Sequence, residues 1–408
     1  MTPEGWRRAS LEETVAPWLS LCQPSADDCR RYVALEHLAQ GEPRLLGWAK
    51  ASEATSTKAE FGAGDVLYGK LRPNLRKAVL ASFDGICSTD ILVLRPKECL
   101  DARFLLNLVH HPSFQTHAVG TASGTKMPRT SWSLLAPFAF ALPPLAEQRK
   151  IAAILSSVDD AIEASQTVID QLHVVKKAMM AELLTKGLPG RHKKFKQTEI
   201  GQVPEEWEIL PLEALAARIC VGIVVKPASY YTEAGVPCLR SKNVKEDRLD
   251  MNDIVFISQE SNVLLGKSML RTGDVVTVRT GEPGTSCVVP AVLDGTNCID
   301  LIITTPGPRV DGRFLSRFLN SAGGRSVVAI GKGGLAQQHF NVGAMKEMPV
   351  PVPRRSEQES IVEPLSSIDG RLADEDSTLD RLRGLKSALM SVLLTGEVRV
   401  RVDEEAAA

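Results

Sequence analysis

The chain has 408 residues, of which 44% are hydrophobic and 24% charged, and its formal net charge is −1. At roughly 100 to 200 residues per domain, this length predicts two or three domains, each able to bury a core. No apolar run reaches the roughly 18 residues of a membrane span, and residues 1–13 lack the apolar stretch of a signal peptide, so we expect a cytoplasmic protein without a membrane segment. The eight cysteines form no CxxC pair and are expected to be reduced, mostly buried thiols.

Residues 1–142 contain short strand-like runs and predict a mixed α/β domain. One run, GDVLYGKL from Gly64, matches the GxxxxGK of a phosphate-binding loop, but Leu71 stands where that loop needs Ser or Thr for Mg²⁺. We therefore interpret Asp65 to Tyr68 as a strand that leads into a basic stretch, YGKLRPNLRK.

A long helix is predicted over residues 143–186, because apolar side chains recur there alternately four and three residues apart, as in a heptad seam. Ser165 and Lys176 occupy the polar positions of the seam. Some 40 helical residues make a rod of roughly 60 Å, which predicts a spacer. The apolar seam residues are Ile151, Leu155, Val158, Ile162, Ile169, Leu172, Met179 and Leu183.

Residues 187–203 are rich in Gly, Pro and Lys and predict a linker. A second domain, residues 204–352, then repeats the first weakly: PEEW answers PEGW, GDVVTVRT answers GDVLYGKL, and DGTNCIDLIITTP answers DGICSTDILVLRP. The agreement is confined to scaffold positions, so two similar frameworks carry different surfaces. The scaffold pairs are Gly64 and Gly273, Asp84 and Asp294, and Asp90 and Asp300.

A second long helix is predicted over residues 353–396, followed by a tail over 397–408, because EQESIVEPLSSIDGRL at Glu357 matches EQRKIAAILSSVDDAI at Glu147 at an offset of 210. The run SEQE from Ser356 fits a capping box, and Pro364 predicts a bend, since a proline inside a helix costs ~3 kcal/mol or kinks it. Glu375 and Lys386 take the polar seam positions. The apolar ones are Ile361, Leu365, Ile368, Leu372, Leu379, Leu382, Leu389 and Leu393.

The whole chain is thus one duplicated unit: a mixed α/β domain followed by a long helix, an α+β class of fold. Two matched seams in one chain predict an intramolecular coiled coil. Lys176 and Lys386 in the seam either specify register and partner or extend their ammonium groups to solvent at a wide part of the seam, and the sequence leaves both possibilities open.

The run LPPLAEQRKIA from Leu142 into a heptad helix, followed by TEIGQVPEEWEILPLEAL at the start of a second domain, resembles the DNA-specificity subunits of type I restriction-modification systems. The resemblance covers essentially the whole chain. It implies two target recognition domains that each read one half of a split DNA site, with the helices paired as an antiparallel coiled coil. The second copy departs from the pattern, reading PVPRRSEQ from Pro351.

The resemblance also implies partners and cofactors. Double-stranded DNA and two methyltransferase subunits are expected partners, and an endonuclease/translocase subunit is a further one. No cofactor is expected in this chain, whereas S-adenosylmethionine, and ATP with Mg²⁺, are expected in the partner subunits. Half-sites read from one face of B-DNA lie about one helical turn, ~34 Å, apart, a spacing that a rod of this length can provide.

Candidate DNA contacts in the first domain are basic residues of two stretches. The basic stretch after Tyr68 suits phosphate, although a solvated loop is an equally good interpretation. GTASGTKMPRTSW differs from its counterpart GKGGLAQQHFNV as reading loops should, although ordinary loop polarity also explains the difference. The candidates are Lys70, Arg72, Arg76, Lys77, Lys126 and Arg129.

Candidate contacts in the second domain come from LRSKNVKEDR and from GKGGLAQQHFNV. Arg suits guanine edges, Asn suits adenine and Lys suits phosphate, but a plain turn explains the first stretch nearly as well. The candidates are Arg240, Lys242, Asn243, Lys245, Gln337, Gln338 and His339.

No catalytic or metal-binding motif is present. The chain contains no NPP[FY]-type tetrapeptide for a flipped adenine, no complete phosphate-binding loop, no glycine motif for S-adenosylmethionine and no HExxH. We therefore expect a DNA-recognition subunit without enzymatic activity. The competing hypothesis is a protein-binding adaptor in which the coiled coil only spaces two domains.

Overall fold

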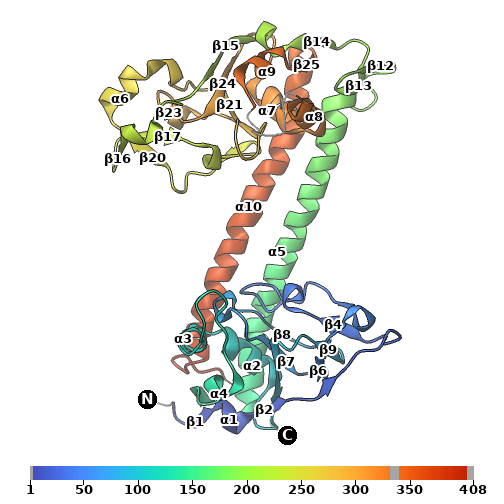
Figure 1. The fold of residues 1–408 in the computed structure, drawn as a ribbon, viewed down its shortest axis with the longest axis vertical. Coiled ribbons are helices and arrows are strands. Elements are labelled where there is room, and N and C mark those ends of the chain that lie inside the picture. The colour runs from blue at the N-terminus through green and yellow to red at the C-terminus, as the bar shows by residue number, and fades with distance from the viewer. Residues whose placement is uncertain (1–2, 331–339, 402–408) are drawn as a thin grey trace. The chain divides into compact units, whose positions relative to one another are not determined.

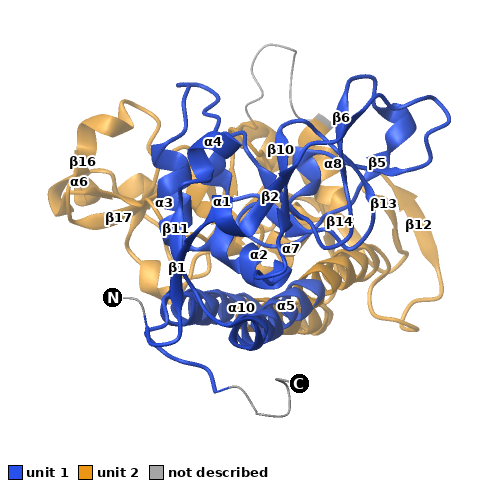
Figure 2. Ribbon diagram, turned by 90° about the horizontal axis from the view of Figure 1, so that it is seen from below, with its two compact units in different colours: residues 1–167, 375–408 blue, residues 168–374 orange. Residues whose placement is uncertain are grey.

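The computed structural model describes residues 3–330 and 340–401. They form two compact units: unit 1 comprises residues 1–167 and 375–408, and unit 2 comprises residues 168–374 (Figure 2). The two long helices, α5 (Leu145–Lys186) and α10 (Arg355–Leu393), each contribute one half to each unit (Figure 1).

Unit 1 is built around an antiparallel sheet in the order β2-β10-β7-β8. A second sheet, β3-β6-β9-β4-β5, and a strand pair, β1-β11, complete its strands. The strands are β1 (Arg7–Ser10), β2 (Val15–Trp18), β3 (Leu21–Cys22), β4 (Arg31–Val33), β5 (Ala49–Lys50), β6 (Lys58–Phe61), β7 (Val66–Gly69), β8 (Ala78–Leu80), β9 (Gly85–Cys87), β10 (Ile91–Pro96) and β11 (Ala139–Leu142). The short helices are α1 (Leu11–Thr14), α2 (Ala102–His110), α3 (Pro112–Gly120) and α4 (Trp132–Leu135).

Unit 2 repeats this plan, with an antiparallel sheet in the order β15-β24-β21-β22 and a second sheet, β16-β20-β17-β23. Its strands are β12 (Phe195–Thr198), β13 (Gly201–Pro204), β14 (Glu208–Pro211), β15 (Ala216–Val221), β16 (Tyr231–Thr232), β17 (Val236–Leu239), β18 (Val244–Lys245), β19 (Arg248–Leu249), β20 (Val255–Ile257), β21 (Val275–Val278), β22 (Ser286–Val288), β23 (Asn297–Cys298), β24 (Leu301–Pro306) and β25 (Pro349–Val352). Its short helices are α6 (Gln259–Leu264), α7 (Gly312–Asn320), α8 (Ala322–Ile330) and α9 (Val342–Glu347). The predicted tandem duplication is confirmed.

The repeated scaffold residues form the turn that precedes the second strand of each main sheet. The Asp84 carboxylate accepts a hydrogen bond from the amide of Ala63 (2.8 Å), as the Asp294 carboxylate does from Thr272 (2.8 Å). The glycines beside these turns have φ of +91° (Gly64) and +87° (Gly273), a conformation that a side chain disfavours. The turn geometry therefore accounts for the repetition of Gly64 as Gly273 and of Asp84 as Asp294.

The two long helices pair in antiparallel fashion, as predicted. In unit 1 the Lys386 ammonium contacts the Asp159 carboxylate at 2.5 Å, and in unit 2 Lys176 contacts Asp369 at 2.7 Å. The two contacts are the same interaction made twice, since both partners are related by the 210-residue offset. The seam lysines thus form ion pairs across the helix pair, which favours their role in register over extension to solvent.

The remaining seam positions agree with this pairing. Ser165 Oγ donates to Glu375 in unit 1 (3.3 Å), so one polar position faces another. None of the apolar seam residues is exposed: eleven are buried and five are half-buried, namely Leu172, Met179, Ile368, Leu382 and Leu389.

The glutamines of the two EQ pairs attach each helix start to its own domain. The Gln148 side chain donates to the carbonyls of Cys99 (2.9 Å) and Pro143 (2.8 Å) and accepts from the amide of Asp101 (2.8 Å). Gln358 makes the three equivalent bonds, at 2.9, 2.9 and 2.7 Å. Both side chains are buried, so the repeated glutamine satisfies three backbone groups that would otherwise lack partners.

The glutamates of the EQ pairs contact basic side chains from the segment that follows the other long helix. Glu147 accepts from Arg399 (2.8 and 2.9 Å) and from the Trp6 indole (2.9 Å), and Glu357 contacts His192 Nε2 at 2.6 Å. Each unit therefore combines the start of one helix with the end of the other.

Two segments are more structured than the sequence indicates. Residues 187–203, predicted as a linker, contain β12 and most of β13, and the side chain of His192 is 2% exposed. The beginning of the predicted tail, residues 397–408, is anchored through Arg399. The cause is the same in both cases: a buried glutamate on a distant helix supplies the partner.

The start of α10 also differs from the prediction. The helix begins at Arg355, and the amide of Gln358 donates to Arg354, so Ser356 lies inside the first turn and does not cap it. The helix continues through Pro364. Within the described part of the chain, no helix is both long and apolar enough to cross a membrane.

Candidate nucleic-acid interface

Two candidate stretches of unit 1, residues 70–77 and 121–130, lie side by side. The amide of Arg72 donates to Pro128 (2.7 Å), and the amide of Thr130 donates to Lys70 (3.0 Å). Residues 70–77 connect β7 to β8 and are called here the β7–β8 loop. The preceding residues 66–69 form a buried strand, so GDVLYGKL is not a phosphate-binding loop.

The basic side chains of this surface have different neighbours. Arg72, Arg76 and Lys126 are exposed. Arg129 is exposed but pairs with Asp90 at 3.0 Å, and the Lys77 ammonium donates to the Leu35 carbonyl at 2.6 Å. Lys77 therefore contributes to the packing of the β7–β8 loop, whereas Arg72 and Arg76 of this loop and Lys126 of the adjacent stretch are exposed to solvent.

Backbone geometry directs the two exposed arginines. Arg72 and Arg76 have φ of +52° and +49°, in the left-handed region that non-glycine residues seldom adopt, and they flank a turn over Pro73–Leu75. Arg72 and Lys126 line one cavity of about 350 Å³. Two cations at one concave surface suit an anionic group such as a phosphate.

A buried side chain fixes the β7–β8 hairpin from behind. His110, the last residue of α2, donates from Nε2 to the carbonyl of Ala78 at the start of β8 (3.0 Å). Burial lowers the pKa of His110 to about 4, so the ring is neutral near pH 7. In unit 2, Asn320 stands at the equivalent position and binds Ser286 at the start of β22.

The predicted residues of LRSKNVKEDR lie elsewhere in unit 2. The Asn243 side chain is fully buried, and its amide donates to the carbonyls of Asp250 (2.9 Å) and Asn252 (3.0 Å). Lys242 pairs with Asp253 (2.8 Å), and the Arg240 guanidinium donates to the Asp253 carbonyl. Lys245 is half-buried in β18. Asn243 is therefore unavailable for a base contact in this structure.

The structural counterpart of the β7–β8 loop in unit 2 is the segment 279–285, called here the β21–β22 loop. Sequence reasoning did not single it out, because it contains one basic residue, Arg279, which pairs with Asp300 at 2.7 Å. The amide of Phe340 donates to the Arg279 carbonyl (3.2 Å), as Thr130 does to Lys70 in unit 1. The signal that could have identified the loop was its position after the repeated GDV.

Three predicted contacts, Gln337, Gln338 and His339, lie outside the described residues. Among residues 3–330 and 340–401, no group of His, Cys, Asp and Glu side chains could hold a metal ion. All eight cysteines are free, and Cys87, Cys238, Cys287 and Cys298 are buried.

Comparison with known proteins gives concordant matches. A family model described as the type I restriction modification DNA specificity domain matches residues 49–174. The MjaVIII specificity subunit of a type I restriction enzyme from Methanocaldococcus jannaschii is 28% identical over 68% of this chain and 66% of that protein. The EcoDI specificity subunit from Escherichia coli is 32% identical over 29% of this chain and 27% of that protein.

Solved structures share the fold. The crystal structure of a type I restriction-modification S subunit from M. genitalium aligns with a TM-score of 0.59 at 14% identity, covering 97% of this chain and 99% of that one. A chain from a study of type I R-M complex assembly aligns with a TM-score of 0.58 at 19% identity, covering 98% and 100%.

Fold and site together define a class of protein: a recognition protein that carries two variants of one α/β framework on a shared pair of helices. Within that class, the chain is similar to the DNA-specificity subunits of type I restriction-modification systems, and residues 49–174 match the specificity domain of these proteins.

Proposed function

We propose that this specificity subunit recognises a two-part DNA site, with unit 1 reading one half and unit 2 the other. One observation carries the proposal: the main sheets of the two units have corresponding strand orders and the units share the EQ attachment, but their corresponding hairpin loops differ in charge. Similar frames with different loops are suited to two different half-sites. We place the contacts of unit 1 on Arg72, Arg76 and Lys126.

The chain supplies recognition, and other subunits of the restriction-modification complex supply the chemistry. We propose two methyltransferase subunits, one for each half of the duplicated frame, and an endonuclease/translocase subunit as a further partner in the cytoplasm. S-adenosylmethionine, and ATP with Mg²⁺, belong to those partners in this proposal.

Sequencing of modified bases tests the proposal directly. DNA from cells that express this chain with its methyltransferase should carry methylated bases at one two-part motif with a fixed gap, and cells lacking either protein should not. Replacement of residues 1–142 by another recognition domain should change one half of the motif. A change in both halves would contradict the division between the units.

Salt dependence separates DNA recognition from the adaptor hypothesis. Each phosphate contact contributes about 0.9 to the slope of log K against log salt, so Arg72→Ala should reduce the slope by about 1. Arg313→Ala, on exposed α7 surface, is the control. A complex with methyltransferase that shows no duplex binding at any salt concentration would favour the adaptor.

A further inference from the structure

The β21–β22 loop carries an acidic residue at the position where unit 1 has a basic loop. Resting on the proposed function of unit 2 as a reader, we propose that Glu282 in this loop recognises a base with an exocyclic amino group. We further propose that Asn320 and Arg325 are positioning residues that fix the loop for this contact.

The chemistry of the loop tip leaves few DNA groups for Glu282 to bind. Thr280, Gly281 and Glu282 are exposed, and the Glu282 carboxylate makes no ion pair with any residue that the structure describes. Phosphates repel a carboxylate, whereas the N4 amino group of cytosine and the N6 amino group of adenine donate in the major groove. A glutamate that faces DNA is therefore suited to one of these two bases.

The turn around Glu282 is tightly defined. The carbonyl of Glu282 accepts from both the amide (3.2 Å) and the hydroxyl (2.9 Å) of Thr285. Gly281 and Gly284 have φ of +94° and +91°, and a Cβ atom at Gly284 would lie 3.1 Å from the side chain of Val328 on α8. The loop is thus closed on itself and packed directly against α8.

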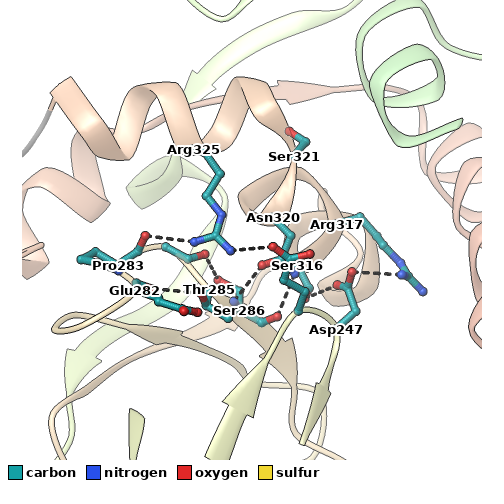
Figure 3. Close-up of polar contacts among 12 residues, drawn as sticks. Asp247, Glu282, Pro283, Thr285, Ser286, Ser316, Arg317, Asn320, Ser321 and Arg325 are labelled. Carbon is teal, nitrogen blue, oxygen red and sulfur yellow. Dashed lines mark hydrogen bonds and ion pairs between the residues drawn. The ribbon is translucent and has the colours of Figure 1, made fainter. Parts of the chain in front are cut away.

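Two polar side chains attach the loop to α7 and α8 (Figure 3). Arg325 on α8 donates to the Pro283 carbonyl (3.1 Å) and pairs with Glu246 (3.0 Å). Asn320, at the end of α7, accepts from the amide of Ser286 (3.0 Å) and donates to its carbonyl (2.9 Å). The loop is therefore bound on both sides of Thr285.

A further contact connects the same strand end to α7. The amide of Asp247 donates to the Ser286 carbonyl (2.9 Å), and its carboxylate accepts from Ser316 (2.7 Å) and Arg317 (3.0 Å), as Figure 3 shows. Side chains of α7 thus reach Ser286 both directly and through Asp247. A loop held in this way can present Glu282 in one orientation without a bound ligand.

The test uses the complex of the full chain with its methyltransferase and measures methylation rates on duplexes that vary one base pair at a time. Glu282→Ala should relax selectivity at one base pair of the half-site read by unit 2, by about tenfold or more, and leave the other half-site unchanged. Glu213→Gln, on exposed surface of the same unit, is the matched control.

Arg325→Ala should lower selectivity across the unit 2 half-site without a change in melting temperature, and Arg325→Lys should restore part of it because an ammonium can still donate to the Pro283 carbonyl. If Glu282→Ala leaves the motif unaltered, or slows methylation equally on every duplex, the proposal is overturned. If the wild-type complex itself shows no two-part motif, the proposed function fails instead, so the two failures are distinguishable.

Discussion

Unit 1 and unit 2 share the strand order of their main sheets but differ in the loops that these sheets carry. The attachments at the helix starts are nearly atom for atom the same, since Gln148 and Gln358 bind equivalent backbone groups. The hairpin loops differ instead: the loop of unit 1 is basic and has two arginines at positive φ, whereas the loop of unit 2 has an acidic tip and glycines at positive φ. The two copies have thus kept the residues that join each domain to its helices, while the residues of the hairpin loops have diverged.

The strongest test of this equivalence removes one glutamine at a time. Gln148→Ala and Gln358→Ala should each destabilise their own unit by about 3 kcal/mol, because one amide and two carbonyls lose a buried partner. Hydrogen exchange of the full chain reads each unit separately, and Gln202→Ala, at an exposed position, is the control. Clearly unequal losses would show that the two attachments are not energetically equivalent.

The equivalent residues His110 and Asn320 should give the units different responses to acid. The pKa of His110 is lowered to about 4 in the fold, so its contribution to stability is complete above the unfolded pKa near 6.5 and is lost as pH falls towards 4. The expected loss for unit 1 is on the order of 2–3 kcal/mol.

His110→Asn, which copies the residue of unit 2, should abolish this part of the acid sensitivity. Hydrogen exchange of the β7–β8 hairpin at pH 7 and pH 5 measures the effect. An unchanged pH dependence in this variant would place the sensitivity in another group.

The two interhelical ion pairs should differ in strength although they correspond in sequence. Asp159 pairs with Lys386 alone among the ion pairs of the described residues, whereas Asp369 contacts both Lys176 and Arg317. Burial raises the pKa of Asp159, so removal of Lys386 leaves a poorly solvated carboxylate.

Lys386→Ala should therefore destabilise unit 1 by about 2 kcal/mol, and Lys176→Ala should destabilise unit 2 by about 1 kcal/mol. Chemical denaturation followed by hydrogen exchange gives both values. Equal losses would mean that Arg317 does not compensate for Lys176.

The smallest expected effects are on the salt dependence of DNA binding, and they compare Lys126 of unit 1 with Lys242 of unit 2. Lys126→Ala should reduce the salt dependence of DNA binding by about one phosphate contact, while Lys242→Ala, which removes an exposed pair with Asp253, should leave it unchanged. The comparison uses the complex with methyltransferase. A reduction of the salt dependence by Lys242→Ala would instead place the stretch around Lys242 in the DNA interface of unit 2.

Periodicity and repetition predicted the helices, their seams and the tandem frame, because these depend on residue spacing. Which loop side chains are exposed and which are buried could not be predicted, because this depends on neighbours outside the local sequence. The Lys77 ammonium donates to the Leu35 carbonyl, and the buried Asn243 amide donates to the carbonyls of Asp250 and Asn252. The structural roles of His110 and Asn320 could not be predicted, because a buried side chain that binds a distant strand carries no local sequence pattern. The β21–β22 loop could not be predicted as a DNA contact either, because it has one basic residue and no cluster of the kind that phosphate contact favours.

The division of the long helices between the units has a consequence for synthesis on the ribosome. Unit 2 is one continuous stretch, residues 168–374, and can close as soon as that stretch has emerged. Unit 1 must wait for residues beyond Glu375, since Glu147 finds its cation at Arg399, 252 residues later. The N-terminal part of unit 1 is thus translated first, but unit 1 is the last unit that can complete its fold. Until then its incomplete core exposes apolar surface, which favours misfolding of the nascent chain.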